Sequence, residues 1–138
     1  MIPSFISIVE MQFIVALILS IAIGLAIGAE REMRNKDAGI STHILVVMGA
    51  MLFTFLSGLV DPASTSRIAA QIVTGIGFLG AGLILKEGHS VHNLTTAASL
   101  WMAAAIGMAI GYGFFVVAVI AGLVAVFIPR IPSVRKPS

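Results

Sequence analysis

The feature that most constrains this chain is a series of long apolar runs in which small residues recur at every fourth position. In the run from 94 to 113 the recurring residues are Thr95, Ser99, Ala103, Gly107 and Gly111. Small side chains let two helix backbones approach closely in lipid, where no hydrophobic force drives helix association. An earlier run repeats the pattern with Ala16, Ser20, Gly24 and Gly28. These two ridges predict a compact helical bundle inside a membrane.

Composition supports a membrane protein and excludes an ordinary soluble domain. Hydrophobic residues make up 59% of the 138 positions and charged residues only 10%, whereas a soluble domain carries roughly 25% charged residues. Cysteine is absent, which excludes disulfides, thiolate metal sites and a nucleophilic thiol. The net charge of +2 is better explained by membrane topology than by a nucleic-acid surface, so we expect no nucleic-acid partner.

The apolar runs predict an all-α integral membrane bundle of five transmembrane helices. Crossing ~30 Å of hydrocarbon takes ~20 residues, and the apolar runs are close to that length. The last run, 94 to 128, would be about 50 Å long as one helix, so it is divided near Tyr112. A single transmembrane domain, 1–138, results, with spans at 11–29, 44–60, 68–85, 94–111 and 113–128 and a short basic tail at 129–138.

Basic residues predict the orientation of these spans, because cytoplasmic loops carry an excess of lysine and arginine. With five spans and an external N-terminus, only Arg67 lies outside. The predicted cytoplasmic residues are Arg31, Arg34, Lys36, Lys86, Arg130, Arg135 and Lys136. Four spans would divide the basic residues evenly, so we predict that the N-terminus is outside and the C-terminus inside.

The third predicted span carries a polar face. Its members, by their helical spacing, are Arg67, Gln71, Thr74 and Gly75. A buried amide needs hydrogen-bond partners, so Gln71 is expected to face the bundle interior. There it either joins helices by hydrogen bonds or lines a path for a solute.

The same span is rich in glycine, at Gly75, Gly77, Gly80 and Gly82. Each glycine costs about 1 kcal/mol of helix propensity relative to alanine in water, so something should compensate. Close helix crossing is the favoured interpretation. A broken helix whose backbone faces a substrate is the alternative.

Charged residues follow the first span, at Glu30, Arg31, Glu32 and Arg34. If the helix continues, Glu30 and Glu32 form favourable i,i+4 pairs with Arg34 and Lys36. The cluster is interpreted as a solvated helix end at the cytoplasmic mouth, or else as a site that docks a partner or gathers cations.

Metal binding and catalysis find little support. His43, His89 and His92 are expected at the interface with a nitrogen in water, since Mg²⁺ prefers oxygen ligands and retained waters. No Ser/His/Asp arrangement is present, so we expect neither an enzyme nor a bound cofactor. No charged residue lies well inside a predicted span, so a Mg²⁺ path would have to use the acids Asp61 and Glu30. Its hydroxyl groups would come from Thr74, Thr95, Thr96 and Ser99.

Three blocks of the sequence resemble the transmembrane domain of the MgtC/SapB family, at 24–50, 67–88 and 91–111. The second block, which contains RIAAQIVTGIGFLGAG, is the most specific. The first matches the family at Glu30 and Arg34, among others, whereas the third has His92 where relatives commonly have arginine. The resemblance implies a bacterial inner-membrane protein tied to survival in low magnesium, in a family long given a disputed transporter label.

Two functions remain open at this point. The first is a regulator that helps cells adapt to low magnesium by binding another membrane protein or itself. The second is a small conduit for Mg²⁺ or another solute along the polar face of the third span. In both cases the chain lies in the lipid bilayer, and its small size favours a homo-oligomer such as a homodimer.

Overall fold

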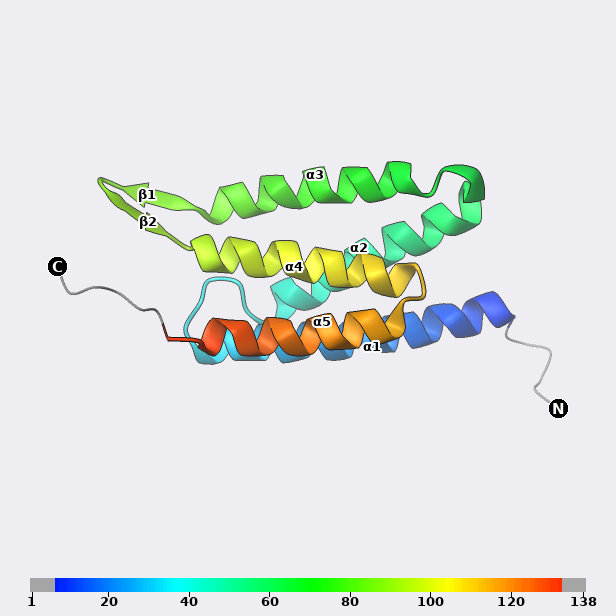
Figure 1. Ribbon diagram of the computed structural model, residues 1–138, viewed down its shortest axis with the longest axis horizontal. Coiled ribbons are helices and arrows are strands. Elements are labelled where there is room, and N and C mark those ends of the chain that lie inside the picture. Colours follow the sequence, from blue (N-terminus) through cyan, green and yellow to red (C-terminus); the bar gives the residue numbers. More distant parts are fainter. Residues whose placement is uncertain (1–6, 133–138) are drawn as a thin grey trace.

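The computed structural model describes residues 7–132, which form a helical bundle (Figure 1). Its α-helices are α1 (Ile8–Met33), α2 (Ile40–Val60), α3 (Ser66–Leu83), α4 (Leu94–Gly111) and α5 (Phe115–Phe127). Short 3₁₀ turns, η1 (Pro62–Ser64) and η2 (Ile128–Arg130), precede α3 and follow α5. A two-stranded hairpin, β1 (Leu85–Glu87) and β2 (Ser90–His92), joins α3 to α4.

The helices confirm the prediction of an all-α membrane bundle. Four of them, α1 to α4, are long and apolar enough to cross a bilayer. The apolar helix α5 has 13 residues, about 20 Å at 1.5 Å per residue, so five spans and their orientation stay a prediction.

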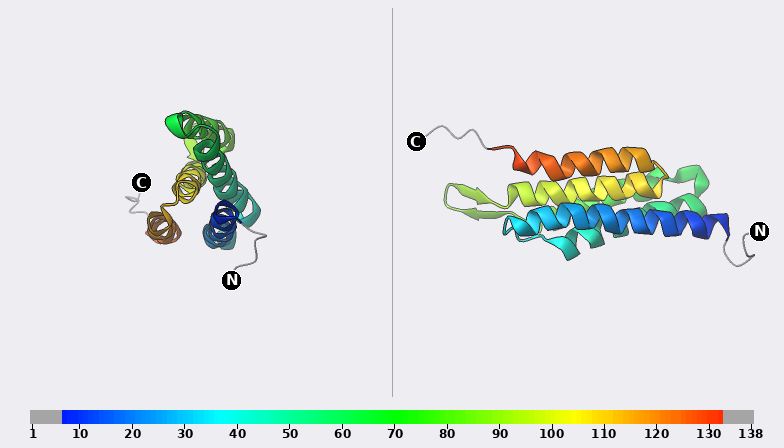
Figure 2. Two further views of the ribbon diagram at one scale, coloured as in Figure 1. Left: turned by 90° about the vertical axis from the view of Figure 1, so that its right-hand side faces the viewer. Right: turned by 90° about the horizontal axis from the view of Figure 1, so that it is seen from below.

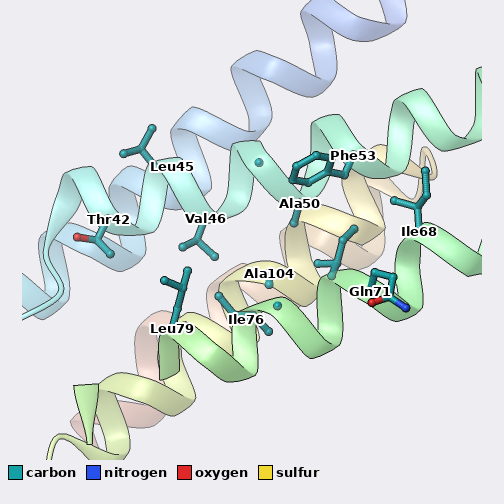
Figure 3. A pocket seen from close by; sticks show the side chains of 13 residues that line it. Thr42, Leu45, Val46, Ala50, Phe53, Ile68, Gln71, Ile76, Leu79 and Ala104 are labelled. Atoms are coloured by element: carbon teal, nitrogen blue, oxygen red, sulfur yellow. The ribbon is translucent and has the colours of Figure 1, made fainter. Parts of the chain in front are cut away.

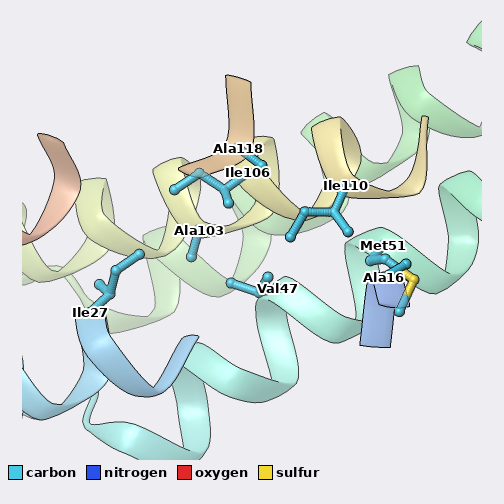
Figure 4. Close-up of a cluster of buried hydrophobic side chains, with 8 residues drawn as sticks. All are labelled: Ala16, Ile27, Val47, Met51, Ala103, Ile106, Ile110 and Ala118. Carbon is cyan, nitrogen blue, oxygen red and sulfur yellow. The ribbon is translucent and has the colours of Figure 1, made fainter. Parts of the chain in front are cut away.

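Helix α2 packs most extensively against α1 and α4, and α3 lies at the edge of the bundle farthest from α1 and α5 (Figure 2). Between the helices lies a cluster of buried apolar side chains (Figure 4). Its members are Ala16, Ile27, Val47, Met51, Ala103, Ile106, Ile110 and Ala118. We call α1, α2 and α4 the central helices, because their mutual contacts form most of this core.

The first predicted ridge is confirmed as the contact between α1 and α2. All four ridge residues, Ala16, Ser20, Gly24 and Gly28, are buried. A methyl group added at Gly28 would come within 2.5 Å of the Ile40 Cα atom, and one at Gly24 within 2.7 Å of the Ile44 Cα atom. These glycines therefore let the two backbones touch.

The second ridge packs on α2 in the same way, with one correction. A methyl group at Gly111 would come within 2.6 Å of the Met51 carbonyl oxygen, and one at Gly107 would overlap the Val47 carbonyl oxygen. At the start of α4, however, Thr95 is exposed and Thr96 is buried. The four-residue spacing drifts around the helix, so Thr96 takes the inward position over the first turn.

Basic residues gather at one end of the bundle, which we call the basic end. It comprises the end of α1, the starts of α2 and α4, the hairpin and η2 (Figure 1). Arg31, Arg34, Lys36, Lys86 and Arg130 all belong to these segments. Arg67 lies at the opposite end, at the start of α3. Arg135 and Lys136 fall outside the described residues.

The hairpin corrects the predicted third span, which was drawn to residue 85. Helix α3 ends at Leu83, and the chain continues as antiparallel strands with Glu87 opposite Ser90. The two-residue turn between them has a positive φ of 60° at Gly88, which glycine adopts without steric cost. The LKEGHSVH segment around a glycine carried this signal, but the apolar Ile84 and Leu85 made the preceding helix look longer than it is.

Helix α3 also corrects the interpretation of its glycines. The helix is unbroken from Ser66 to Leu83, and added methyl groups at Gly75, Gly77 and Gly82 would meet no atom of residues 7–132 within 4 Å. Only Gly80 faces a neighbour, 3.7 Å from the Ala97 Cβ atom. Three of the four glycines therefore make no close helix crossing within residues 7–132, and close crossing with another chain stays a prediction.

Candidate functional site

Charged and polar side chains are buried at the basic end, where α1 ends and α2 and α4 begin. The relative exposure of Glu30 is 2%, that of Arg31 is 1% and that of His43 is 0%. The predicted solvated helix end is thus wrong for Glu30 and Arg31, although Glu32 and Arg34 are exposed. The reason is that α1 continues to Met33, four residues beyond the predicted span, and its last turns pack under the two other helices.

Glu30 is held by two guanidinium groups. Its Oε1 atom lies 2.5 Å from the Arg34 Nε atom and its Oε2 atom lies 3.8 Å from an Arg31 nitrogen. The contact with Arg34 confirms the predicted i,i+4 pair. Neither carboxylate oxygen accepts a well-aligned hydrogen bond. Since a buried carboxylate is costly unless paired, these two arginines are what stabilise it.

Arg31 connects α1 to α4. Its Nη2 atom donates to the Thr96 Oγ1 atom over 3.4 Å, a long hydrogen bond, and its Nε atom has no acceptor. A guanidinium group carries five N–H donors, so Arg31 is incompletely satisfied for a buried residue. Arg31 lies in the last turn of α1, beyond the predicted span 11–29, so the absence of charge well inside a span stays a prediction.

His43 connects α2 to α4. Its Nδ1 atom lies 2.9 Å from the Gly39 carbonyl oxygen, and its Nε2 atom lies 3.1 Å from the Ser99 hydroxyl. Because a carbonyl only accepts, Nδ1 carries a proton. The Ser99 hydroxyl also lies 2.7 Å from the Thr96 carbonyl oxygen, to which it can donate. The expected wet imidazole is therefore wrong: both ring nitrogens have partners inside the bundle.

No local pattern indicated that these side chains meet, because the contact of Arg31 with Thr96 spans 65 positions and that of His43 with Ser99 spans 56. We call Glu30, Arg31, His43, Thr96 and Ser99 the buried polar cluster. It contains Thr96 and Ser99 from the predicted hydroxyl ridge and Glu30 and Arg31 from the predicted mouth cluster. A reader of the sequence could have suspected it only from the polar residues that begin both α2 and α4.

Two further contacts close the basic end over this cluster. The Glu32 carboxylate accepts a 3.0 Å hydrogen bond from the Ile40 backbone N–H at the start of α2. This contact replaces the predicted Glu32–Lys36 pair, since α1 ends at Met33. The Asn93 amide donates to the Asp37 carboxylate and ties the α1–α2 loop to the start of α4.

The polar face of α3 lies away from this cluster, beside a groove between α2 and α3 (Figure 3). The groove has a volume of about 760 Å³ and is almost entirely apolar, with Ala50 and Ala104 among its lining residues. Gln71 lines the groove and is exposed, so the prediction that Gln71 faces the bundle interior is wrong. The helix turns its buried side, with Ile76 and Gly80, towards α4 instead.

The remaining residues of the predicted polar face have no role in an enclosed path, because they contact their own neighbours or line the groove. Arg67 forms an exposed ion pair with Asp61 across the η1 turn, and the Thr74 hydroxyl donates to the Ala70 carbonyl oxygen over 3.2 Å. Gly75 lines the groove. The face therefore borders an open lateral surface and does not surround an enclosed path.

Residues 7–132 contain no group of three or more His, Asp or Glu side chains that could hold a metal ion. Of the two acids named for Mg²⁺, Asp61 pairs with Arg67 and Glu30 pairs with Arg34. His89 and His92 are exposed in the hairpin region.

Comparison with known families confirms the resemblance to the MgtC/SapB family. A model of the MgtC family matches residues 17–133, which include α1 to α5 almost completely. The chain belongs to the MgtC family. Together with its apolar helices, this membership makes it a multi-pass membrane protein of a magnesium-related family.

Relatives agree with this assignment. The chain is 52% identical over 114 residues to YhiD of Escherichia coli K12, described as a candidate magnesium transporter, with 75% of this chain and 53% of YhiD covered. It is 50% identical over 103 residues to MgtC of Salmonella typhimurium LT2, with 75% of this chain and 45% of the relative covered. MgtC of Brucella abortus is 47% identical over 116 residues, with 83% and 48% covered. The chain thus spans about half the length of these relatives, and no solved structure matches it.

Proposed function

We propose that this chain is a regulator of magnesium homeostasis in the bacterial inner membrane, and that it acts by lateral contact with membrane proteins. The observation that carries the proposal is the position of the α3 polar face. Gln71 borders an open groove on the side of the bundle, where another protein can reach it. A conduit within one chain would instead need such groups around an enclosed path.

The central helices support the same proposal, because their contacts leave little room for a path between them. At Gly28 and at Gly111 the backbones approach so closely that a single added methyl group would overlap the neighbouring helix. Tightly packed interfaces of this kind resist separation. The hydrogen bonds of the buried polar cluster hold α1, α2 and α4 together at the basic end.

The proposed topology has five spans, with the N-terminus outside and the basic end in the cytoplasm. Charge supports it: Arg31, Arg34, Lys36, Lys86 and Arg130 share one end of the bundle, opposite Arg67. On this proposal the chain has no enzymatic activity and no resident cofactor, and lipid surrounds its lateral surface.

A growth assay tests the proposal. In a bacterium that lacks its own copy of this protein, the wild-type chain should restore growth at limiting magnesium. Gly75→Leu places a large side chain in the groove, where nothing lies within 4 Å of an added methyl group, so the bundle should still fold. We expect this variant to accumulate normally and to lose most of the growth benefit.

The matched control is Val116→Leu on α5, which enlarges a 73% exposed apolar side chain away from the groove and should support full growth. Full growth with Gly75→Leu would contradict a function that depends on contact through the groove.

A further inference from the structure

His43 is a buried titratable side chain that the proposed function does not use. It lies in the first turn of α2, with an exposed fraction of 0%, and contacts α4 through its ring. Histidine is the side chain whose charge ordinarily changes between pH 5 and 8. The other two histidines of the chain, His89 and His92, are exposed in the hairpin region. Among residues 7–132, a pH change in this range therefore reaches a buried imidazole at His43.

The neutral ring of His43 joins α2 to α4. Its Nδ1 atom donates to the Gly39 carbonyl oxygen, so the unprotonated Nε2 atom can accept the proton of the Ser99 hydroxyl, 3.1 Å away. With a second proton on Nε2, the ring would donate to Ser99 instead. The hydroxyl would then turn to the Thr96 carbonyl oxygen, 2.7 Å away. Hydrogen bonding alone therefore does not exclude the charged ring.

The charges around His43 oppose its protonation inside the cluster. Those that act on the ring are Arg31 and Glu30, both on α1, whereas α4 faces it with hydroxyl groups. The Glu30 carboxylate is already shared by the guanidinium groups of Arg31 and Arg34. A protonated His43 would be a third cation beside one carboxylate. Because burying an unpaired charge is costly, proton uptake is expected to release the ring from the cluster.

The turn of α2 that carries His43 also forms part of the groove. Thr42 and Leu45 lie on either side of His43 in the sequence, and both line the groove (Figure 3). They belong to the end of α2 that starts at the basic end. A displacement of this turn would therefore change the groove as well as the buried polar cluster.

We propose that His43 is a proton-binding site that controls the packing of α2 at the basic end. At neutral pH the neutral ring joins α2 to α4. When the cytoplasm acidifies below about pH 6.5, the ordinary value for histidine, the ring binds a proton and the start of α2 separates from α4.

This inference deepens the proposed function, because it makes contact through the groove depend on cytoplasmic pH. It rests on the proposed function and topology for that consequence. The proton-linked separation of α2 from α4 is measured on the purified chain without any partner, so the two can fail separately.

Amide hydrogen exchange at pH 7.5 and pH 5.5, measured by mass spectrometry on the protein in lipid nanodiscs, tests the inference. Protection factors are corrected for the intrinsic pH dependence of exchange. Segments 40–47 and 94–100 should lose protection about tenfold at pH 5.5, because each pH unit below the ordinary histidine value favours the proton-binding open state tenfold. Segments 54–60 and 105–111, at the other ends of the same helices, are internal controls and should keep their protection.

Two glutamine variants identify the group that binds the proton. His43→Gln keeps a polar side chain that takes up no proton in this range, so its protection factors at the two pH values should agree within about twofold. His92→Gln, the matched change in the exposed hairpin region, should keep the tenfold loss of the wild type.

Equal protection of the wild-type segments at both pH values would overturn the inference, and this result requires no variant to fold. A uniform loss along the whole of α2 and α4 would contradict it as well, since the change would then be global unfolding. So would a tenfold loss that persists in His43→Gln. If the exchange result held while Gly75→Leu still supported full growth, the proton site would stand and the proposed function would fall.

Discussion

The central helices and α3 use small residues in opposite ways. In α1 and α4 the small residues face α2, and glycines such as Gly28 and Gly111 leave no room for a methyl group. In α3 the small residues face outwards, and Gly75 and Gly77 have nothing within 4 Å. A small-residue pattern therefore identifies a contact surface without showing whether the contact lies within the chain.

The two regions also differ in how they hold charge. The central helices bury Glu30 and Arg31 almost completely, whereas α3 begins with the exposed Asp61–Arg67 pair. Buried Arg31 also joins α1 to α4 through Thr96, whereas the exposed pair contributes little to stability. Variants in one region should therefore change folding, and variants in the other should change association.

The largest expected effect comes from breaking the buried pair. Arg31→Leu leaves the Glu30 carboxylate buried with poorer compensation and should destabilise the folded chain by about 3–5 kcal/mol. Arg67→Leu, the matched change in α3, removes an exposed pair and should cost less than about 1 kcal/mol. Denaturant unfolding in detergent, followed by Trp101 fluorescence, measures both. Equal costs of the two substitutions would show that buried Arg31 contributes no more to stability than exposed Arg67.

A smaller effect is expected from one methyl group in each region. Gly107→Ala forces a methyl group against the Val47 carbonyl oxygen and should cost about 3 kcal/mol, at the upper end of typical overpacking. Gly77→Ala meets open space and should be neutral or should gain up to about 1 kcal/mol from helix propensity. The midpoint of thermal unfolding in dilute detergent distinguishes them. A Gly107→Ala protein as stable as the wild type would mean that α2 and α4 are farther apart than described.

The smallest effect compares two histidines. His43→Leu removes the hydrogen bonds to Gly39 and Ser99 and should cost about 1–2 kcal/mol, because buried acceptors and donors lose their partners. The exposed His92→Leu on the hairpin should change stability by less than about 0.5 kcal/mol. The same denaturant titration compares them, and a larger cost at His92 would contradict the burial of His43 and the exposure of His92.

Periodicity was sufficient to predict the helices and the two internal ridges, because the small-residue spacing and the apolar runs are local properties of the sequence. Periodicity did not predict the exposure of Gln71. The spacing placed Gln71 on one face of α3 but did not show which face the neighbouring helices cover. Spacing likewise did not show that three of the four α3 glycines meet no atom of residues 7–132. Helical spacing defines a face, but only the packing of other helices decides whether that face is inside.

The buried polar cluster lay beyond sequence reasoning for a different physical reason. Glu30 and Arg31 lie next to exposed Glu32 and Arg34, so local composition indicated a solvated end. Their burial depends on the starts of α2 and α4 covering the last turns of α1, which brings His43 to Ser99 and Arg31 to Thr96. Such contacts between distant segments leave no mark in a single sequence.

The most direct test of the account is Mg²⁺ flux into proteoliposomes that contain the purified, correctly inserted protein, with empty vesicles and Gln71→Leu as controls. If the protein acts by lateral contact and its central helices are closely packed, neither the wild type nor the variant should give flux above that of empty vesicles. Saturable flux that disappears in Gln71→Leu would contradict the account and place a conduction path along α3.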